Sequence, residues 1–216
     1  MQYRTSEENI WKTLSLLAQN KEYAQKELPK ALGKDYHTGL RYIQKLEKEG
    51  DIELARTESP DAGGKAKKFY RITVKGFIKY VFLSPKPCLK LEEVVQNHPD
   101  MFLTFTKFGQ FKKAGVAQQI LEVIGKAVDS NRLSYRMVFQ KAEIQPHHVE
   151  LIKQQIDKAI LVDYILLAKD KNLAKVCKAD PKLDHFITTE INKDIREAKT
   201  ILERTTGYLD WYASLS

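Results

Sequence analysis

The sequence has no long apolar run and only two cysteines. No apolar stretch approaches the ~18 residues that a membrane-spanning helix needs, and acidic residues stand near the start, where a signal peptide has its apolar segment. Cys88 and Cys177 lie far apart and form no CxxC pair, so we expect free thiols in a reducing compartment. These absences predict a cytoplasmic protein with no membrane segment.

The common catalytic motifs are also missing. The chain contains no GxxxxGK[ST], GxGxxG, HExxH or GxSxG pattern. Its one adjacent histidine pair, His147–His148, would point in directions about 100° apart on a helix, which disfavours a shared metal ion. Acidic pairs such as Glu92–Glu93 have no neighbouring base. We therefore expect no enzymatic activity, no metal and no cofactor.

Positive charge is in excess, and most of the excess lies near the N-terminus. The chain has 36 Lys and Arg against 28 Asp and Glu, a net charge of +8. Residues 1–87 contain 17 basic and 11 acidic residues, a net charge of +6, which leaves +2 for residues 88–216. This asymmetry points to a polyanionic partner, most often nucleic acid. A lysine-rich solvated surface is the alternative.

Two prolines in the stretch Ser84–Pro87 mark the best boundary, because they break helix and strand and favour an extended connector. We expect an N-terminal domain over residues 1–83, a linker over 84–90 and a C-terminal domain over 91–180. A long helix over 181–216 follows. The expected fold class is mainly α with small β-hairpins (α+β).

Three helices open the N-terminal domain. Apolar residues at i, i+4 and i+7 from Ile10 predict the first. The second ends at Gly33, and its interior Pro29 predicts a kink or two short turns. The third begins at the N-cap Asp35 and ends at Gly50. Its polar face carries Lys34, His37, Thr38, Arg41, Lys45 and Lys48, whereas Leu40, Ile43 and Leu46 form the apolar face.

A long basic hairpin follows the third helix. Residues 51–56 alternate as a half-buried strand does, and residues 68–72 are its predicted partner. The connecting loop contains Gly63–Gly64 and is too long for a tight turn. Residues 54–79 contain seven Lys and Arg against two acids, a net charge of +5.

Residues 5–80 resemble a known DNA-binding domain, that of the winged helix-turn-helix transcriptional regulators of bacteria and archaea, broadly the MarR- and PadR-like superfamily. The matching pieces are AQKELPKALG, YHTGLRYIQKLEKEGDIEL and YRITVKG. The sequence departs from the family pattern at Pro29 and at Gly39, where an aliphatic residue is usual. The resemblance implies a recognition helix in the major groove and a wing on the backbone or minor groove.

The resemblance and the charge together predict a sequence-specific, dimeric DNA-binding regulator of transcription. The alternative is a winged-helix adaptor in a transcription, replication or RNA-processing assembly, without sequence-specific binding. The predicted contacts to double-stranded DNA are Lys34, His37, Thr38, Arg41, Lys45, Lys48, Arg56, Lys65, Lys67 and Lys68. The sequence leaves the operator and any small-molecule effector open.

Residues 91–180 are predicted to be mostly helical. Pro146 suits the first turn of one helix, whereas Met101–Phe105 fits either strand or helix. The β-prone run Ile160–Leu167, followed by a turn signal, predicts a β-hairpin over 161–178. Helices followed by such a hairpin would permit a second winged-helix-like fold.

The C-terminal helix carries a heptad-like apolar stripe, which predicts a homodimer. The predicted dimerisation residues are Ile187, Ile191, Ile195, Ala198, Leu202 and Leu209. One long helix packed along its own domain is the alternative. A two-fold dimer would place the two recognition helices about 34 Å apart, one turn of DNA.

Overall fold

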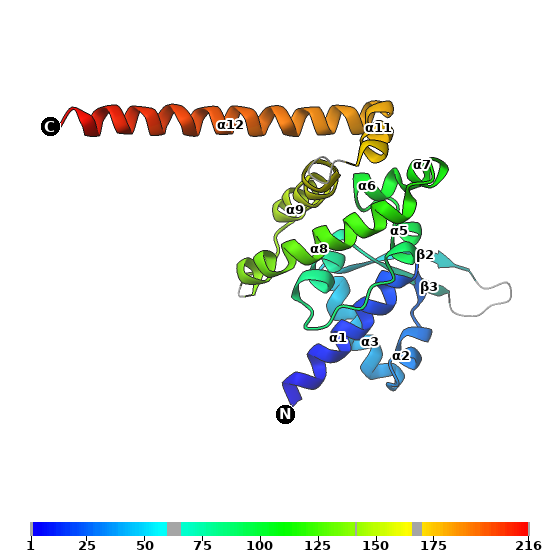
Figure 1. The fold of residues 1–216 in the computed structure, drawn as a ribbon. Coiled ribbons are helices and arrows are strands. Elements are labelled where there is room, and N and C mark those ends of the chain that lie inside the picture. Colours follow the sequence, from blue (N-terminus) through cyan, green and yellow to red (C-terminus); the bar gives the residue numbers. More distant parts are fainter. Residues whose placement is uncertain (1, 60–65, 141, 166–169, 216) are drawn as a thin grey trace.

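The computed structural model describes residues 2–59, 66–140, 142–165 and 170–215. The fold is mostly helical, with one three-stranded antiparallel sheet and a long C-terminal helix (Figure 1). This architecture confirms the mainly-α fold class expected from the sequence. None of the described helices is both long enough and apolar enough to cross a membrane.

The sheet and the first three helices come from the N-terminal part of the chain. β3 is the central strand, with β1 and β2 on its two sides, and both pairings are antiparallel. Ile52, Tyr70 and Ile72 point from the sheet into the core. The elements are α1 (Gln2–Gln19), β1 (Tyr23–Ala24), α2 (Glu27–Ala31), α3 (Tyr36–Lys48), β2 (Ile52–Glu58) and β3 (Lys67–Ile72).

The local signals around α3 act as predicted. The carboxylate of Asp35 accepts a hydrogen bond from the amide of Thr38 at 2.9 Å and caps the helix. Gly33 and Gly50, with φ of 64° and 73°, end α2 and α3 in a left-handed conformation. Pro29 does not kink α2, because the helix begins only at Glu27 and the proline lies in its first turn, where amide donors lack helical partners in any case.

The chain then forms several short helices that pack around one long helix, α8. These elements are α4 (Val74–Ile78), the π-helix η1 (Lys79–Leu83), α5 (Leu91–Asn97), α6 (Leu103–Thr106), α7 (Phe108–Lys113) and α8 (Ala117–Phe139). We call these helices, together with the elements before them, the body. Residues 84–90 form neither helix nor strand. They are held to the body, since the Tyr80 hydroxyl accepts from the amide of Cys88 at 2.9 Å and Arg132 donates to the carbonyl of Ser84 at 2.6 Å. One hydrophobic core extends from Ile10 to Leu183 and includes residues on both sides of this connector.

The predicted β-hairpin over 161–178 is wrong. The chain forms α9 (Pro146–Lys158), the π-helix η2 (Ala159–Tyr164) and α11 (Lys171–Ala179), and residues 166–169 lie outside the described part. The run at 160–165 is buried almost throughout, so it shows no polar–apolar period that would separate a buried helix from a buried strand. Among the described residues no strand follows Ile72, so the second winged-helix-like fold is also wrong.

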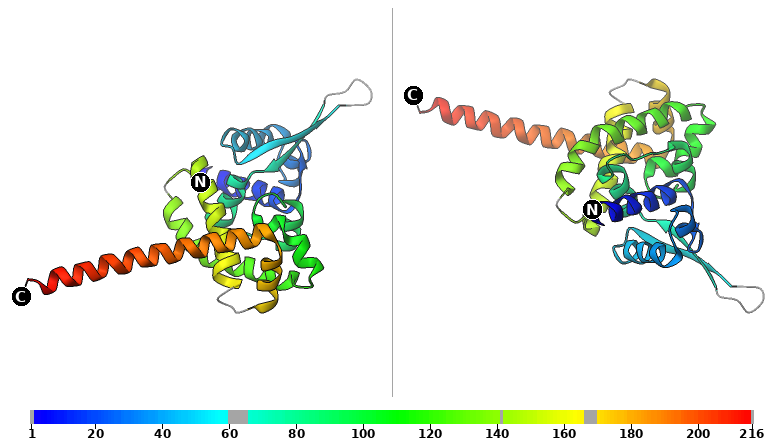
Figure 2. Two further views of the ribbon diagram at one scale, coloured as in Figure 1. Left: turned by 90° about the horizontal axis from the view of Figure 1, so that it is seen from above. Right: turned by 90° about the horizontal axis from the view of Figure 1, so that it is seen from below.

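The long helix α12 (Pro181–Ala213) begins on the body and leaves it (Figures 1 and 2). Asp180 caps it by accepting from the amides of Lys182 and Leu183 at 2.9 and 3.1 Å. Leu183 is fully buried, and Lys158 of α9 pairs with Asp194 about three turns later. Every described side chain from Ile195 onwards is exposed.

Candidate nucleic-acid interface

α3 presents one face to the core and the other to solvent. Gly39, Ile43 and Leu46 are buried against the neighbouring helices and the sheet. Leu40, the third predicted apolar residue, is only half-buried. At 100° per residue the buried positions leave a wide opposite face, which is exposed along the whole helix.

Four of the six predicted contacts at α3 lie together on this exposed face: His37, Arg41, Lys45 and Lys48. Within the described part of the chain, no carboxylate lies at ion-pair distance from Arg41 or Lys48, whereas Lys45 has Glu49 at 3.8 Å. These cations therefore remain available to an external anion.

The other two, Lys34 and Thr38, are half-buried at the start of the helix. Hydrogen bonds from the Thr38 side chain and amide hold the pKa of the Asp35 carboxyl below its ordinary value. Thr38 thus acts in the helix cap, and we assign it no contact with a ligand.

Sequence reasoning missed two exposed residues of α3. Gln44 lies on the exposed face, about 20° from His37 and 40° from Lys48 around the helix. Tyr36 is exposed in the first turn, and its ring meets that of His37 edge to face at 5.8 Å. The helical period alone would have found Gln44, because it stands three residues after Arg41, but a search for cations passes over it.

The β2–β3 hairpin extends away from the body (Figures 1 and 2). Lys67 and Lys68 are exposed near its outer end, opposite Glu58 and Thr57. Neither lysine has an ion-pair partner among the described residues. The third predicted lysine of this region, Lys65, lies outside the described residues.

Arg56 is bound by its own chain. Its guanidinium donates to Glu22 at 2.6 Å and to Glu58, and it lies 3.8 Å above the ring of Phe69. The hydrogen bonds to Glu58 and Glu22 raise the pKa of Arg56. The side chain therefore fastens β1 and the hairpin together, and only part of its charge is available to a ligand.

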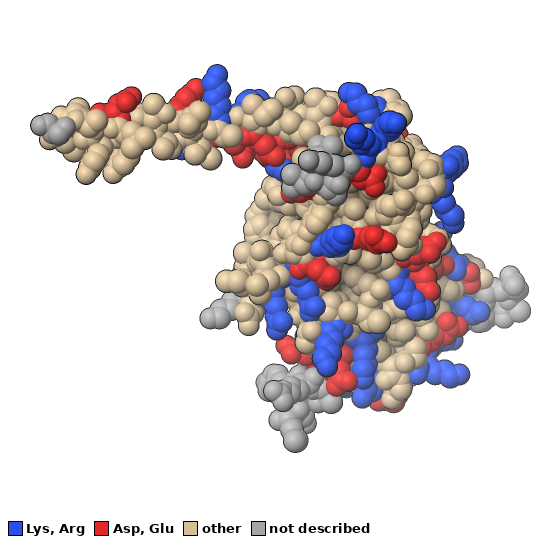
Figure 3. Space-filling view, viewed as in Figure 1, with Lys and Arg blue, Asp and Glu red and all other residues tan. Residues whose placement is uncertain are grey.

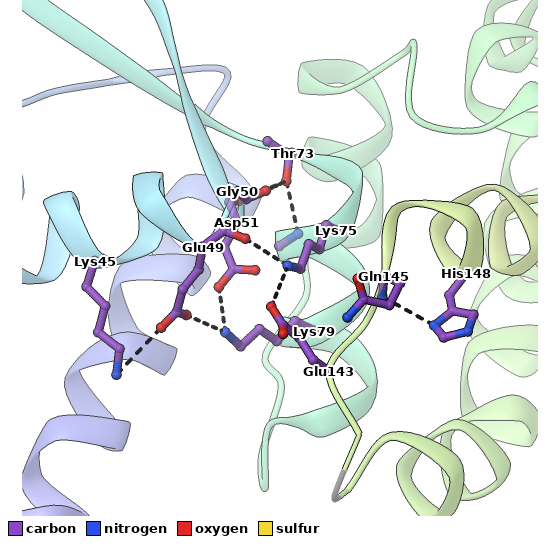
Figure 4. Close-up of polar contacts among 11 residues, drawn as sticks. Lys45, Glu49, Gly50, Asp51, Thr73, Lys75, Lys79, Glu143, Gln145 and His148 are labelled. Carbon is purple, nitrogen blue, oxygen red and sulfur yellow. Dashed lines mark hydrogen bonds and ion pairs between the residues drawn. The ribbon is translucent and has the colours of Figure 1, made fainter.

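A polar network anchors the C-terminal end of α3 to α4 and η1 (Figure 4). Lys79 donates to Asp51 at 2.5 Å and to Glu49 at 2.9 Å, and Lys75 donates to the carbonyl of Glu49 at 2.8 Å. Burial raises the pKa of the Asp51 carboxyl, whereas the two carboxylates raise the pKa of Lys79 against the opposing effect of its burial. A side chain on Gly76 would overlap the carbonyl oxygen of Asp51, so the backbones touch here.

A cleft lies beside the hairpin, and no residue of α3 lines it. Its volume is about 720 Å³. Basic side chains alternate with acidic ones around it, so it does not favour a polyanion. Its charged lining residues are Lys21, Glu22, Glu53, Arg56, Arg71 and Asp100.

The described residues contain no group of three or more metal-binding side chains. The ring nitrogen Nδ1 of His148 accepts from the amide of Gln145 at 3.2 Å, as part of a capping box for α9. His148 therefore has a structural role at the start of that helix.

The predicted dimerisation stripe divides into two parts. Ile187 packs against the core of its own chain and Ile191 is half-buried, so the start of α12 follows the alternative of a helix packed on its own domain. The rest of the stripe is exposed, and it comprises Ile195, Ala198, Leu202 and Leu209.

Comparison with known proteins identifies no relative of this chain. The chain matches no protein-family model, no curated protein and no solved structure. A functional assignment therefore depends on the surface features described above.

Proposed function

We propose that residues 2–83 form a winged-helix domain that binds double-stranded DNA. The order of elements supports this assignment: a helix, a short strand, two helices and a hairpin, with the short strand paired to the second strand of the hairpin. In a winged helix-turn-helix, the helix before the hairpin enters the major groove and the hairpin forms the wing. In the proposed domain α3 would be the helix that enters the groove, and the β2–β3 hairpin would be the wing.

The proposal depends mainly on the exposed face of α3. It brings His37, Arg41, Gln44 and Lys48 onto one side of a helix of 13 residues, and an α-helix fits the width of the major groove. Arginine reads guanine through two hydrogen bonds and glutamine reads adenine in the same way. This face therefore combines base-reading side chains with cations that attract phosphate.

The hairpin adds a second contact. Lys67 and Lys68 are exposed on opposite faces of β3, and lysines bind phosphate as point charges without reading sequence. We expect the hairpin to hold the duplex backbone or the adjacent minor groove. Together the two elements favour a sequence-specific transcriptional regulator. The exposed stripe on α12 favours a homodimer, and we expect the protein to act in the cytoplasm.

A non-specific adaptor is the second candidate. Acidic side chains lie among the basic ones over the surface formed by α1, α2 and α3 (Figure 3). Mixed charge of this kind also suits a protein partner, and it lowers the attraction for DNA backbone alone. The two candidates differ in whether base sequence changes the affinity.

Substitution of Arg41 tests the proposal. Duplexes selected from a random library would give a preferred site, and competition titrations would give its affinity relative to scrambled duplexes. We expect Arg41→Ala to weaken binding to the preferred site by about 1–3 kcal/mol and to relax preference at one base position. Arg41→Lys keeps the charge, so it should retain non-specific binding and lose the preference.

Arg196→Ala is the matched control, because Arg196 is exposed on α12, on the opposite side of the body from α3 (Figure 1). It should leave affinity and preference unchanged. A preferred-to-scrambled ratio below about ten for the unmodified protein would favour the adaptor. If Arg41→Ala matched the parent in affinity and preference, α3 would not be the recognition helix.

A further inference from the structure

The outer half of α12 exposes an unusual amount of apolar surface. The large apolar side chains from Ile195 onwards are each more than half exposed, although they lie within about six turns of one helix. They are Ile195, Ile201, Leu202, Tyr208, Leu209, Trp211, Tyr212 and Leu215. A lone helix gains little stability from propensity in water, so this segment needs a partner surface.

The apolar face continues the face that the body already buries. Leu183 is fully buried against the body, and Ile201, Tyr208 and Tyr212 lie within about 20° of its direction at 100° per residue. The heptad stripe through Ala198 and Leu209 borders this face. The outer helix extends past the edge of the body (Figure 1), and its apolar side has the direction of the side that the body buries at Leu183.

The pattern fits a second copy of the same helix. Apolar residues recur at the 3–4 spacing of a two-stranded seam, with Ile195, Ala198, Leu202 and Leu209 on it. Trp211 faces the other side of α12 and Leu215 lies beyond residue 213. If each of the other six large side chains loses about 100 Å² on pairing, two copies bury about 1,200 Å² in total, which reaches the size range of stable protein interfaces. A two-fold pair covers the face of both helices at once.

The position of the body favours an antiparallel pair of α12 helices over a parallel one. At Leu183 and Ile187 the apolar side of α12 is occupied by its own chain. In a parallel pair both bodies would lie at the same height and compete for that side. In an antiparallel pair, overlap is confined to residues 195–213, and each body lies beyond the end of the other helix.

We propose that two copies pair antiparallel through residues 195–213 of α12 and that the dimer bridges two DNA duplexes. The second part rests on the proposed DNA-binding function. α3 and α12 lie on opposite sides of the body (Figure 1), so a two-fold axis between antiparallel α12 helices turns the two α3 helices away from each other. If Ala198 lies opposite Leu209 of the second copy, the two Ile187 positions are about 50 Å apart along the helices. A single palindromic site would require both α3 helices to face the same duplex, about 34 Å or a multiple of it apart, which this opposed orientation does not allow.

Mass measured by light scattering tests the pairing. The chain has a mass of 24.9 kDa, so the unmodified protein should give a dimer of twice that mass. Ile195→Glu with Leu202→Glu should give a folded monomer, because both substitutions place charge in the seam. The matched control is Arg196→Glu with Thr200→Glu, which places the same residue type on the opposite side of α12 and should leave the dimer intact. A monomeric unmodified protein at micromolar concentration would overturn the proposal.

Disulfide trapping tests the direction. In a Cys88→Ser background, Ala198→Cys and Leu209→Cys should each fail to cross-link two copies, because equivalent positions lie about 16 Å apart in the antiparallel pair. The chain with both cysteines should form a covalent dimer under oxidation. Efficient cross-linking of either single-cysteine chain would indicate a parallel pair and overturn the arrangement.

Duplex capture tests the bridging. The unmodified protein should join a bead-bound duplex to a labelled duplex in solution, whereas the Ile195→Glu, Leu202→Glu variant should bind single duplexes and capture none. Two subunits bound to one duplex without capture would overturn the bridging and leave the DNA-binding function intact. Failure of every variant to bind any duplex would instead overturn the proposed function, and the bridging with it, whatever the cross-linking shows.

Discussion

The backbone of Gly39 in α3 packs directly on the ring of Pro29 in α2. A side-chain carbon on Gly39 would lie 2.5 Å from Cγ of Pro29 and closer still to its Cβ. Both residues are buried, and each explains the other: the proline ring fills the space that an ordinary side chain on α3 would take. The two departures from the winged-helix sequence pattern are therefore one packing arrangement, which fixes how α3 sits on α2.

Gly39→Ala is therefore expected to destabilise the protein, although alanine favours helix. Overpacking costs about 1–3 kcal/mol, more than the gain of about 1 kcal/mol from helix propensity. Gly109→Ala in α7 is the matched control, because its added carbon meets nothing within 4 Å and should be neutral or stabilising. Denaturant unfolding would measure both.

Removal of the Pro29 ring should relieve its clash with a side-chain carbon added at Gly39. In a double-mutant cycle, Pro29→Gly combined with Gly39→Ala should be less destabilised than the sum of the two single changes. Simple additivity would show that the two residues do not restrain each other.

The hairpin lysines should contribute to affinity without sequence preference. Neutralising Lys65, Lys67 and Lys68 to Gln together should lower affinity for every duplex alike. Each lost phosphate contact should reduce the slope of log affinity against log salt by about 0.9. A titration across salt concentrations, on preferred and scrambled duplexes, measures both effects.

The matched control removes the same charge elsewhere. Lys112, Lys113 and Lys175 are exposed on α7 and α11, and their change to Gln should leave the slope unchanged. An equal reduction for both triple variants would mean that the effect comes from net charge and that the hairpin makes no local contact.

Asp180 holds the start of α12 in place. Besides capping the helix, its carboxylate accepts from Lys107 at 2.7 Å and from Gln110 at 2.6 Å, both on or beside α7. Asp180→Ala should cost about 2–4 kcal/mol, since it removes a cap and leaves the largely buried Lys107 without its partner. Asp170→Ala removes only a cap, that of α11, and should cost about 1 kcal/mol.

The same carboxylate predicts a dependence on pH. The hydrogen bond from Lys107, with that from Gln110, holds the pKa of Asp180 well below its ordinary value of 3.8. The stabilisation is therefore present above about pH 4 and is lost as the pH falls through the folded-state pKa. The difference in unfolding free energy between the unmodified protein and Asp180→Asn should shrink below pH 4. If this difference in unfolding free energy stayed constant down to pH 2, the stabilisation by Asp180 would not depend on its negative charge.

The elements around α3 could be predicted from the amino-acid sequence, because the signals there act over a few residues. A carboxylate at Asp35 reaches an amide three residues on, and Gly50 adopts a positive φ at low cost. Residues 52–56 lie in a strand as predicted, but Leu54 is exposed and Ala55 is half-buried, so burial along the strand does not follow the predicted alternation. The helical period separated the exposed from the buried side of α3. These rules need no knowledge of the rest of the chain.

Features that depend on partners distant in the sequence could be seen only in the folded chain. The run at 160–165 is buried on nearly all sides, so its pattern fits strand and helix equally until neighbouring helices choose. Arg56 has the composition of a DNA contact, but Glu22 and Phe69, both more than ten residues away, hold it. The stripe on α12 is continuous in sequence, yet only packing shows that the body covers Ile187 and leaves Ile195 exposed, because burial is a property of what lies opposite a residue and not of the residue itself.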